Sequence, residues 1–315
     1  MTVHHTTKSR NLLLLAIALL LVSAVLCPDT VRADPLPGKF YVIGTGPAGP
    51  EHATLKAIDT IKKADLILCS ESMEQRFAEY LHNKPILDNH PWKEMFSYKG
   101  KSWREIVQSE PELIKEFARH RIAKRDRMVR RIQAKMREGK TVALLNSGDP
   151  CLFGPCHWFV EGFDPANVEI IPGVGAFSAA MAALKKSSIP AYDGRFVLQT
   201  APSFLFDTSP AAPKPKESAI LKHIARYPGT LAFYMALPKL ESLVAKLKAH
   251  YPPDLPIAVV YHAGYPEKEK VVQANLQTIL QQTATIDENW MGMVIVGSCL
   301  QGKPYRSRAE GILRK

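Results

Sequence analysis

Three glycines and two prolines lie within residues 44–50, directly after the apolar run at residues 40–43. Glycine lets a backbone turn sharply and bring its N–H groups close to a ligand, and open α/β sheets bind small molecules where their parallel strands end. Gly44, Gly46 and Gly49 have the spacing of the G-x-G-x-x-G pattern, but Pro47 directly after the second glycine and Pro50 directly after the third argue against a dinucleotide pyrophosphate site. The loop therefore predicts a small-molecule site built from backbone. An ordinary strand-to-helix turn is the alternative.

Two later apolar runs end in loops of the same kind. Residues 141–145 lead into Asn-Ser-Gly-Asp-Pro at 146–150 and then Cys-Leu-Phe-Gly at 151–154. Residues 168–171 lead into Pro-Gly-Val-Gly-Ala at 172–176 and an alanine-rich segment. Asp149 supplies a carboxylate within these loops, which can accept hydrogen bonds from a polar ligand. The sequence lacks H-E-x-x-H, G-x-S-x-G and clustered metal ligands, so it predicts a ligand site without a metal or a hydrolase nucleophile.

Strands alternate with helices along the chain, which predicts an α/β fold. Its 315 residues, 46% of them hydrophobic, can bury one large core or two modest ones. We expect two domains, the first with a mainly parallel sheet and the second with a mixed sheet. The expected strands are residues 40–43, 65–68, 141–145, 168–171, 196–198, 230–235, 257–261 and 291–297, and the expected helices include 111–138, 176–184 and 239–250.

The order of these loops is similar to that in the tetrapyrrole methyltransferase family, whose members use S-adenosylmethionine. The resemblance covers residues 40–302. The segment Val-Val-Tyr-His-Ala-Gly-Tyr-Pro-Glu-Lys at residues 259–268 most resembles the precorrin-4 methyltransferase branch of cobalamin synthesis. The resemblance implies a donor site in a cleft between two domains, C-methylation of a precorrin-like tetrapyrrole and a homodimer. Methyl transfer from a sulfonium is mainly a matter of positioning and desolvation, which suits loops rich in backbone contacts.

The resemblance also implies which residues contact the donor. They come from the three loops and from two later segments: Pro47, Ser147, Gly148, Asp149, Leu152, Gly175, Ala176, Met235 and Ala263. Without the resemblance, Met235 reads as an ordinary core residue and Asp149 as a turn residue. The first loop departs from the family's usual G-P-G-D-P, since residues 46–50 read Gly-Pro-Ala-Gly-Pro and lack the acid. In the third loop Gly175 replaces the usual hydroxyl residue.

The N-terminus has the layout of a secretory signal. Lys8 and Arg10 precede an uncharged apolar run at residues 12–27, and the small Ala33 stands where signal peptidase cleaves. Asp34 is the expected new N-terminus, and an uncleaved membrane anchor is the alternative. The charge distribution places the body outside the cytoplasm. Because S-adenosylmethionine is made and used in the cytoplasm, a cytoplasmic location is the other alternative. The expected divisions are residues 1–34 (signal or anchor), 35–174, 175–302 and a loose basic tail at 303–315.

A long helix is predicted from Pro111, a residue tolerated in the first turn, to the terminating Gly139. The region from 71 to 139 is longer than is usual for the family, and residues 82–98 are expected to form a loop. Apolar residues recur in the helix at helical spacing and predict its buried stripe: Ile122, Val129, Ile132 and Met136.

Residues 115–140 hold eleven Lys and Arg against three Asp and Glu, a net charge of +8 of the chain's +11. A solvated helix face is one interpretation. The other is a surface for a polyanion such as a carboxylate-bearing tetrapyrrole, with Arg127 and Arg131 as candidate substrate contacts. No nucleic-acid motif accompanies the charge, so nucleic acid is not expected as a partner. Membrane association is expected only through residues 12–27.

Four of the five cysteines lie beyond the leader. Cys69 and Cys299 end apolar runs and are expected to be buried. The C-x4-C-H segment formed by Cys151, Cys156 and His157 is a longer-spaced relative of the C-x-x-C-H haem attachment motif. A Cys151–Cys156 disulfide after export is the stronger alternative.

We therefore expect an S-adenosylmethionine-dependent C-methyltransferase acting on a tetrapyrrole. The alternative from another class is an exported or membrane-tethered tetrapyrrole binder that has lost turnover. A methyltransferase acting on a peptide is a third reading, since a fold does not dictate one acceptor.

Overall fold

The computed structural model describes residues 36–190, 194–205, 219–302 and 304–313. The signal or anchor expected over residues 1–34 lies outside the described residues. Within the described part of the chain, no helix combines the length and the apolar character that a membrane crossing requires.

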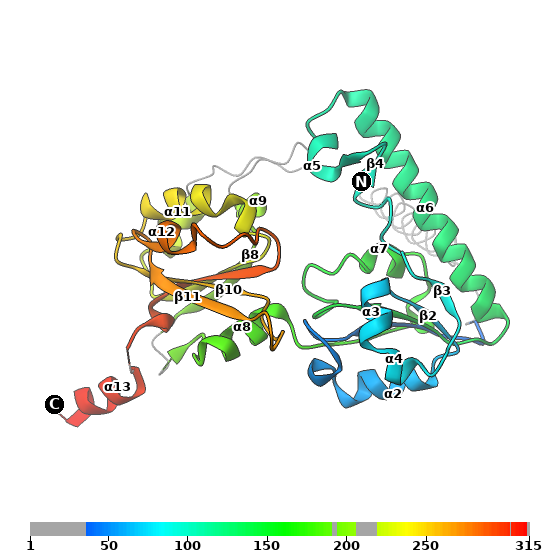
Figure 1. Ribbon diagram of the computed structural model, residues 1–315, viewed down its shortest axis with the longest axis horizontal. Coiled ribbons are helices and arrows are strands. Elements are labelled where there is room, and N and C mark those ends of the chain that lie inside the picture. The colour runs from blue at the N-terminus through cyan, green and yellow to red at the C-terminus, as the bar shows by residue number, and fades with distance from the viewer. Residues whose placement is uncertain (1–35, 191–193, 206–218, 303, 314–315) are drawn as a thin grey trace, which may run out of the picture. The chain divides into compact units, whose positions relative to one another are not determined.

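The first sheet has the order β3-β2-β6-β1-β7, and all its pairings are parallel (Figure 1). Near-continuous apolar runs form its central strands, as expected where helices cover both faces of a parallel sheet. All five residues of β6 are buried. The strands are β1 (Phe40–Gly44), β2 (Leu66–Leu68), β3 (Ile86–Asp88), β6 (Val142–Asn146) and β7 (Val168–Ile171).

Three helices cover one face of this sheet: α2 (Leu55–Lys63), α3 (Glu71–Arg76) and α4 (Ala78–Leu81). The Thr54 side chain caps α2 by accepting a hydrogen bond from the Ala57 N–H at 3.0 Å. Ile61 of α2 and Phe77, at the junction of α3 and α4, pack against strand residues such as Ile43 in one buried cluster. These helices place the segment after β2 beside the first loop.

The long helix α6 runs from Pro111 to Arg137 and ends before Gly139, which has φ +77°. Val129, Ile132 and Met136 are buried as predicted. The prediction for Ile122 is wrong, since its side chain is 52% exposed. The reason is that the N-terminal part of α6 packs on residues 97–106 instead of on the sheet (Figure 1). There Phe117 contacts the rings of Tyr98 and Trp103.

The loop expected over residues 82–98 contains regular structure. Ile86–Asp88 forms β3, the edge strand of the first sheet. Ser97–Tyr98 (β4) pairs with Lys101–Ser102 (β5), and α5 (Trp103–Ile106) follows with a capping box from Ser102 and Glu105. Strands this short carry too little periodicity to be recognised in a sequence.

The second sheet has the order β11-β10-β12-β9-β8. Strands β8 and β9 run parallel, whereas β9, β12, β10 and β11 pair antiparallel in turn. The predicted fold class, with a parallel first sheet and a mixed second sheet, is confirmed. The strands are β8 (Phe196–Thr200), β9 (Gly229–Phe233), β10 (Pro256–Tyr261), β11 (Lys270–Asn275) and β12 (Gly292–Gly297).

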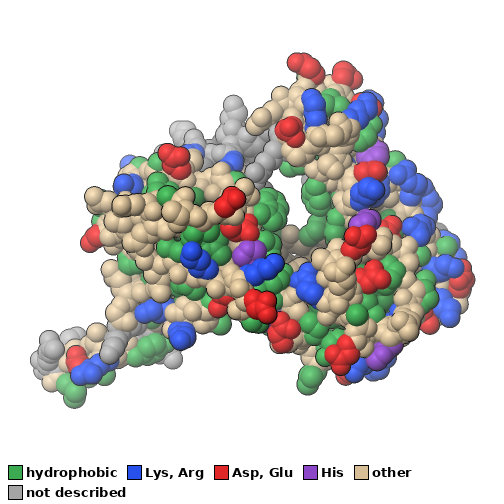
Figure 2. All heavy atoms as spheres, viewed as in Figure 1, with side chains coloured by type: hydrophobic (Ala, Val, Ile, Leu, Met, Phe, Trp, Pro, Cys, Tyr) green, Lys and Arg blue, Asp and Glu red, His purple; other side chains and the backbone are tan. Residues whose placement is uncertain are grey.

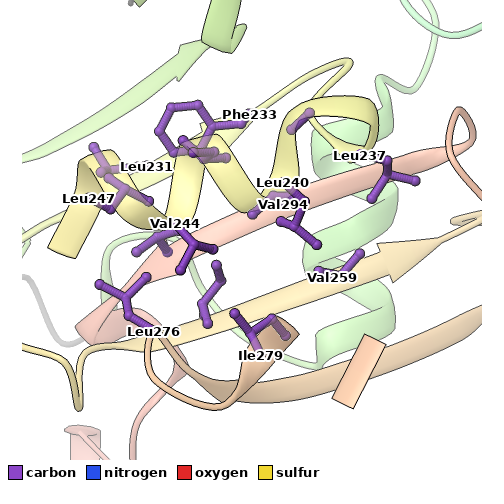
Figure 3. Close-up of a cluster of buried hydrophobic side chains, with 14 of the residues drawn as sticks. Leu231, Phe233, Leu237, Leu240, Val244, Leu247, Val259, Leu276, Ile279 and Val294 are labelled. Carbon is purple, nitrogen blue, oxygen red and sulfur yellow. The ribbon is translucent and has the colours of Figure 1, made fainter. Parts of the chain in front are cut away.

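Helices cover both faces of the second sheet (Figure 1). On one face, α11 (Leu240–Lys248) and α12 (Ile279–Thr283) bury a cluster of aliphatic side chains against Phe233 and Val294 (Figure 3). On the other face, α8 (Ala176–Leu184) packs its small residues against β10 and β12.

Short helices complete the described chain. The tail beyond residue 302 was expected to be loose, but residues 304–313 form a helix with an Arg306–Glu310 ion pair one turn apart. Residues 202–205 form one short helix, and residues 206–218 lie outside the described residues. These elements are α7 (His157–Val160), α9 (Pro202–Leu205), α10 (Ala219–Ile224), α13 (Pro304–Leu313) and the 3-10 turns Pro50–His52, Pro165–Asn167, Leu237–Lys239 and Ser298–Leu300.

Candidate functional site

The three glycine- and proline-rich loops meet where the parallel strands of the first sheet end. They follow β1, β6 and β7, which are neighbours in the order β6-β1-β7, so parallel pairing brings their carboxyl ends together. The Gly148 N–H donates to the Gly46 carbonyl at 2.8 Å, and the Thr45 N–H donates to the Asn146 carbonyl at 2.9 Å. The first and second loops are therefore joined by backbone hydrogen bonds.

Close backbone contacts explain the glycines at the base of these loops. A Cβ on Gly173 would stand 2.4 Å from the Gly148 carbonyl oxygen and 2.7 Å from the Gly44 carbonyl carbon. A Cβ on Gly44 would stand 2.5 Å from the Gly173 nitrogen. Each loop thus packs directly on the backbone of the others, and the three form one unit.

Gly148 differs from these packed glycines. Its φ of +74° lies in the left-handed region, which favours glycine, and a Cβ there would meet no atom within 4 Å. The backbone at the tip of the second loop is consequently open on one side. That open side is where a ligand can approach.

A pocket of about 250 Å³ lies at the second loop. Three of the predicted contact residues, Ser147, Asp149 and Leu152, line it. The Ser147 hydroxyl donates to the Pro47 carbonyl at 3.5 Å, so Pro47 lies beside the same loop. The other residues that line the pocket are Ser70, Met73, Trp92, Leu145, Asn146, Phe153, Gly154 and Pro155.

Asp149 holds the turn of the second loop. One oxygen of its carboxylate, Oδ1, accepts the Cys151 N–H at 2.9 Å. The charge is also felt by the Tyr234 phenol, whose pKa is raised to about 12 by burial first and by the Asp149 charge in addition. Tyr234 therefore remains a neutral hydroxyl near Asp149 at neutral pH, and it donates to Gln199 Oε1 at 2.7 Å.

The third loop and the Met235 turn also lie against the second loop. Gly175 precedes Ala176 at the start of α8, and a Cβ on Gly175 would stand 3.7 Å from Asp149 Cβ. Met235 is not the core residue that its sequence alone suggests: it has φ +51° and is 39% exposed. The ring of the preceding Tyr234 lies 4.8 Å from that of Phe153.

Ala263 lies in a turn beside the first loop. Its neighbours His262 and Gly264 have φ values of +46° and +84°. A Cβ on Gly264 would stand 3.2 Å from Pro47 Cγ and 3.0 Å from His52 Nε2. The described structure thus brings all the predicted donor-contact residues to the three loops or to the turns next to them.

A nearby carboxylate occupies the position of the acid that is missing from the first loop. A Cβ on Gly49 would stand 2.7 Å from Glu51 Oε2, so the Glu51 carboxylate occupies the space where a side chain at position 49 would begin. The other oxygen of that carboxylate lies 3.3 Å from His52 Nδ1. A negative charge is therefore present at this turn despite the departure in sequence.

Sequence reasoning missed Arg76, at the end of α3. Its guanidinium Nη1 donates to the Ala48 carbonyl and, at 3.0 Å, to the Tyr265 hydroxyl. The guanidinium also lies 5.8 Å from the centre of the Tyr265 ring. Arg76 therefore ties the first loop to the turn that carries Ala263. Only the basic character of the residue was visible in the sequence, because its partners lie far along the chain.

We expect Arg76→Ala to weaken ligand binding at the loops at least about tenfold, because a hydrogen bond to a charged group contributes about 1.5–3 kcal/mol. The lost bond holds the Ala48 carbonyl, and Ala48 directly follows the predicted contact residue Pro47. Arg76→Lys should give an intermediate loss, since it keeps the charge but not the forked geometry. Calorimetry with the demethylated donor product would measure both. The control is Arg131→Ala, which removes a comparable bond to the Leu87 carbonyl. Equal affinities for Arg76→Ala and the parent would contradict this role.

The basic stretch on α6 is only partly solvated. Figure 2 shows Lys and Arg side chains gathered along this helix. Arg127 is exposed, but Arg131 donates to the Leu87 carbonyl at 2.7 Å and pairs with Asp88 at 3.4 Å. Lys124 donates to the Lys93 carbonyl. Arg131 is thus exposed, as a solvated face requires, but it also holds the segment after β3, as does the half-buried Lys124.

The cysteines in the described chain are free thiols. Cys69 and Cys299 are buried, as predicted, and Cys156 is buried while Cys151 is exposed. Burial raises the pKa of Cys156 to about 11 and that of Cys69 to about 12, so both remain protonated at neutral pH. No group of three or more His, Cys, Asp and Glu that could hold a metal is found among the described residues.

Comparison with known proteins agrees with this arrangement. The chain is 27% identical over 271 residues to the cobalt-precorrin-4 C(11)-methyltransferase of Methanocaldococcus jannaschii, covering 85% of this chain and 90% of the relative. Its fold resembles the solved structure of a cobalt precorrin-4 methyltransferase, with a TM-score of 0.57 at 23% identity and coverage of 84% and 96%. It also resembles a Thermus thermophilus uroporphyrin-III C-methyltransferase complexed with S-adenosyl homocysteine, with a TM-score of 0.52, 21% identity and coverage of 84% and 94%. The sequence model of the tetrapyrrole (corrin/porphyrin) methylases matches residues 39–280. The chain therefore belongs to the tetrapyrrole methylase family.

Proposed function

We propose that this protein transfers the methyl group of S-adenosylmethionine to a ring carbon of a precorrin-like tetrapyrrole. It is a methyltransferase of the tetrapyrrole methylase family, and S-adenosylmethionine is its methyl donor. The observation that carries the proposal is the convergence of the loops after β1, β6 and β7 around an open backbone at Gly148. The likeness to precorrin-4 methyltransferases supports the precorrin class of acceptor.

The bound donor supplies an activated methyl group on a sulfonium. The protein's task is then to hold that group in line with a nucleophilic carbon and to exclude water. Loop backbone around Gly148 offers N–H and carbonyl groups at close range. Asp149 places a negative charge beside the site, suited to the cationic end of the donor, and the nearby Tyr234 is a neutral hydroxyl because burial raises its pKa to about 12.

Two rivals remain as proposals of other classes. A tetrapyrrole binder without turnover would keep the donor loops but fail to transfer a methyl group, and the departures at Ala48, Gly49 and Gly175 are the features that motivate it. A peptide acceptor is the second rival. The expected homodimer, the N-terminal signal and the location outside the cytoplasm stay predictions.

The test is calorimetry of the full chain with S-adenosylhomocysteine, followed by incubation with S-adenosylmethionine and a precorrin mixture. We expect donor-product binding and a mass gain of one methyl group on the ring. Binding without transfer would favour the non-catalytic rival. Absence of any donor binding would overturn the proposed function itself.

Asp149→Asn tests the electrostatic part of the site. Asparagine keeps the Oδ1 acceptor for the Cys151 N–H, so the turn should persist while the charge is lost. We expect donor affinity to fall by about 1–3 kcal/mol, the range for losing a charged hydrogen-bond partner. The same change should lower the pKa of the Cys151 thiol, which burial and then the Asp149 charge raise. Thiol titration therefore verifies that the charge is gone, and unchanged donor affinity in that verified variant would exclude Asp149 as a donor contact.

A further inference from the structure

A second pocket, of about 440 Å³, lies beside the pocket at the second loop. The two share two walls. On α3, Met73 lines the pocket at the second loop and its neighbour Glu74 lines the 440 Å³ pocket. In the segment after β3, Trp92 lines the pocket at the second loop and its neighbour Lys93 lines the 440 Å³ pocket. Trp92 is fixed by stacking on Phe159, with ring centres 5.1 Å apart. The two pockets therefore lie next to each other along α3 and the segment after β3.

Two lysines give the second pocket its positive charge. Lys124 of α6 and Lys93 of the segment after β3 both line it. Burial lowers the pKa of Lys124, the charges of Glu94 and Asp88 oppose this effect, and the charges of Arg127 and Lys93 make smaller contributions that lower it. The ammonium of Lys124 is thus partly desolvated at the pocket.

The acidic side chains around the pocket are largely engaged. Asp88 accepts the His90 backbone N–H at 2.7 Å and pairs with Arg131 at 3.4 Å. Glu94 lies 3.3 Å from His120 Nε2. Glu74 and Asp88 line the pocket together with Lys93 and Lys124, and because Asp88 pairs with Arg131, Glu74 is the acid left to oppose the two lysines in the lining. The balance favours an anionic ligand group.

We infer that this pocket binds a side-chain carboxylate of the tetrapyrrole through Lys124 and Lys93. The inference rests on the proposed function and identifies which part of the basic surface meets the substrate. A carboxylate placed between two lysines makes charge-assisted hydrogen bonds and offsets the desolvation of Lys124. Arg131, a candidate from the sequence, instead holds the pocket wall, and Arg127 acts on Lys124 only through its field.

The experiment is a titration of the full chain with uroporphyrin III, followed by ring absorbance. Uroporphyrin carries an acetate and a propionate on every pyrrole, so it presents carboxylates all around its edge. We expect Lys124→Gln and Lys93→Gln each to weaken ring binding about tenfold, the loss of one charged hydrogen bond, and to make it less sensitive to salt. Glutamine can still donate to the Lys93 carbonyl, so Lys124→Gln should keep the wall intact.

The matched controls are Lys115→Gln and Lys135→Gln. They remove the same charge from the same helix, where each lysine pairs with a glutamate three residues away. Both should bind uroporphyrin and S-adenosylhomocysteine as the parent does, and the two pocket variants should keep parental affinity for S-adenosylhomocysteine. Coproporphyrin, in which methyl groups replace the acetates, should bind the parent more weakly and respond less to the pocket substitutions.

Uniform effects of all four lysine substitutions would mean that only the net charge of α6 matters, and would overturn the inference. So would inorganic phosphate that displaces the ring at equal concentration, since the pocket would then be a general anion site. Parental ring affinity in both pocket variants would overturn it as well. If the parent binds the ring but not S-adenosylhomocysteine, the proposed methyl transfer fails while the carboxylate pocket stands.

Discussion

Gly148→Val should abolish binding of S-adenosylmethionine and its demethylated product while the chain stays folded. Gly148 has φ +74° and an open side at the tip of the second loop, so a branched side chain there projects into the path of the ligand. Valine in this left-handed conformation also strains the backbone by about 1–2 kcal/mol. Calorimetry with S-adenosylhomocysteine measures the binding, and thermal unfolding measures the strain.

Gly139→Val is the matched control for this change. Gly139 has nearly the same φ, +77°, and a Cβ on it would likewise meet no atom within 4 Å, but it follows the C-terminus of α6. Both substitutions should cost similar stability, and only Gly148→Val should remove donor binding. If the two variants bind the donor equally well, the donor does not approach the open face of Gly148.

The loops could be predicted from the sequence because their signal is local. Three apolar runs ending in Gly/Pro segments predict strand ends, and parallel pairing then places those ends side by side. The resemblance added the later residues Met235 and Ala263, which no local pattern singles out. Met235 in particular reads as core, and only its φ of +51° and its exposure show that it belongs to a turn.

Arg76 and the carboxylate pocket could not be predicted, because they depend on contacts between distant segments. The Tyr265 hydroxyl that accepts from Arg76 lies 189 residues further along the chain. Lys124 looks like any solvated helix residue until β3 forms and brings the Lys93 carbonyl to it. The prediction that Ile122 is buried was wrong for the same reason. The apolar stripe is regular, but the sheet that should cover it ends before the helix does.

Two carboxylates lie next to the departures from the family's loop sequence. The acid absent from position 49 is replaced in space by Glu51, and the hydroxyl absent from position 175 leaves room beside Asp149. The part that admits no substitution is the backbone packing beneath the loops. A side chain there would separate the strands' ends and not merely change one contact.

Gly173→Ala tests that packing and should have the second large effect. The new Cβ would stand 2.4 Å from the Gly148 carbonyl oxygen and within 3 Å of the Gly44 backbone, so the third loop must move away from the first and second. Overpacking of this kind costs about 1–3 kcal/mol of stability. Because a misplacement of about 1 Å can reduce activity about a hundredfold, methyl transfer should fall by that order. Thermal unfolding and single-turnover methyl transfer are the measurements.

Gly175→Ala is the control for Gly173→Ala. It shows whether any new side chain in the third loop is harmful or only one at the position packed against the other loops. Its φ of −78° suits alanine, and its Cβ would lie an ordinary 3.7 Å from Asp149 Cβ. Alanine there should leave the unfolding temperature at the parental value and change donor affinity by less than Gly173→Ala does. Should Gly173→Ala instead retain parental stability and transfer, the three loops would have enough freedom to part without losing the site. Donor binding would then not depend on the backbone contacts that hold the three loops together.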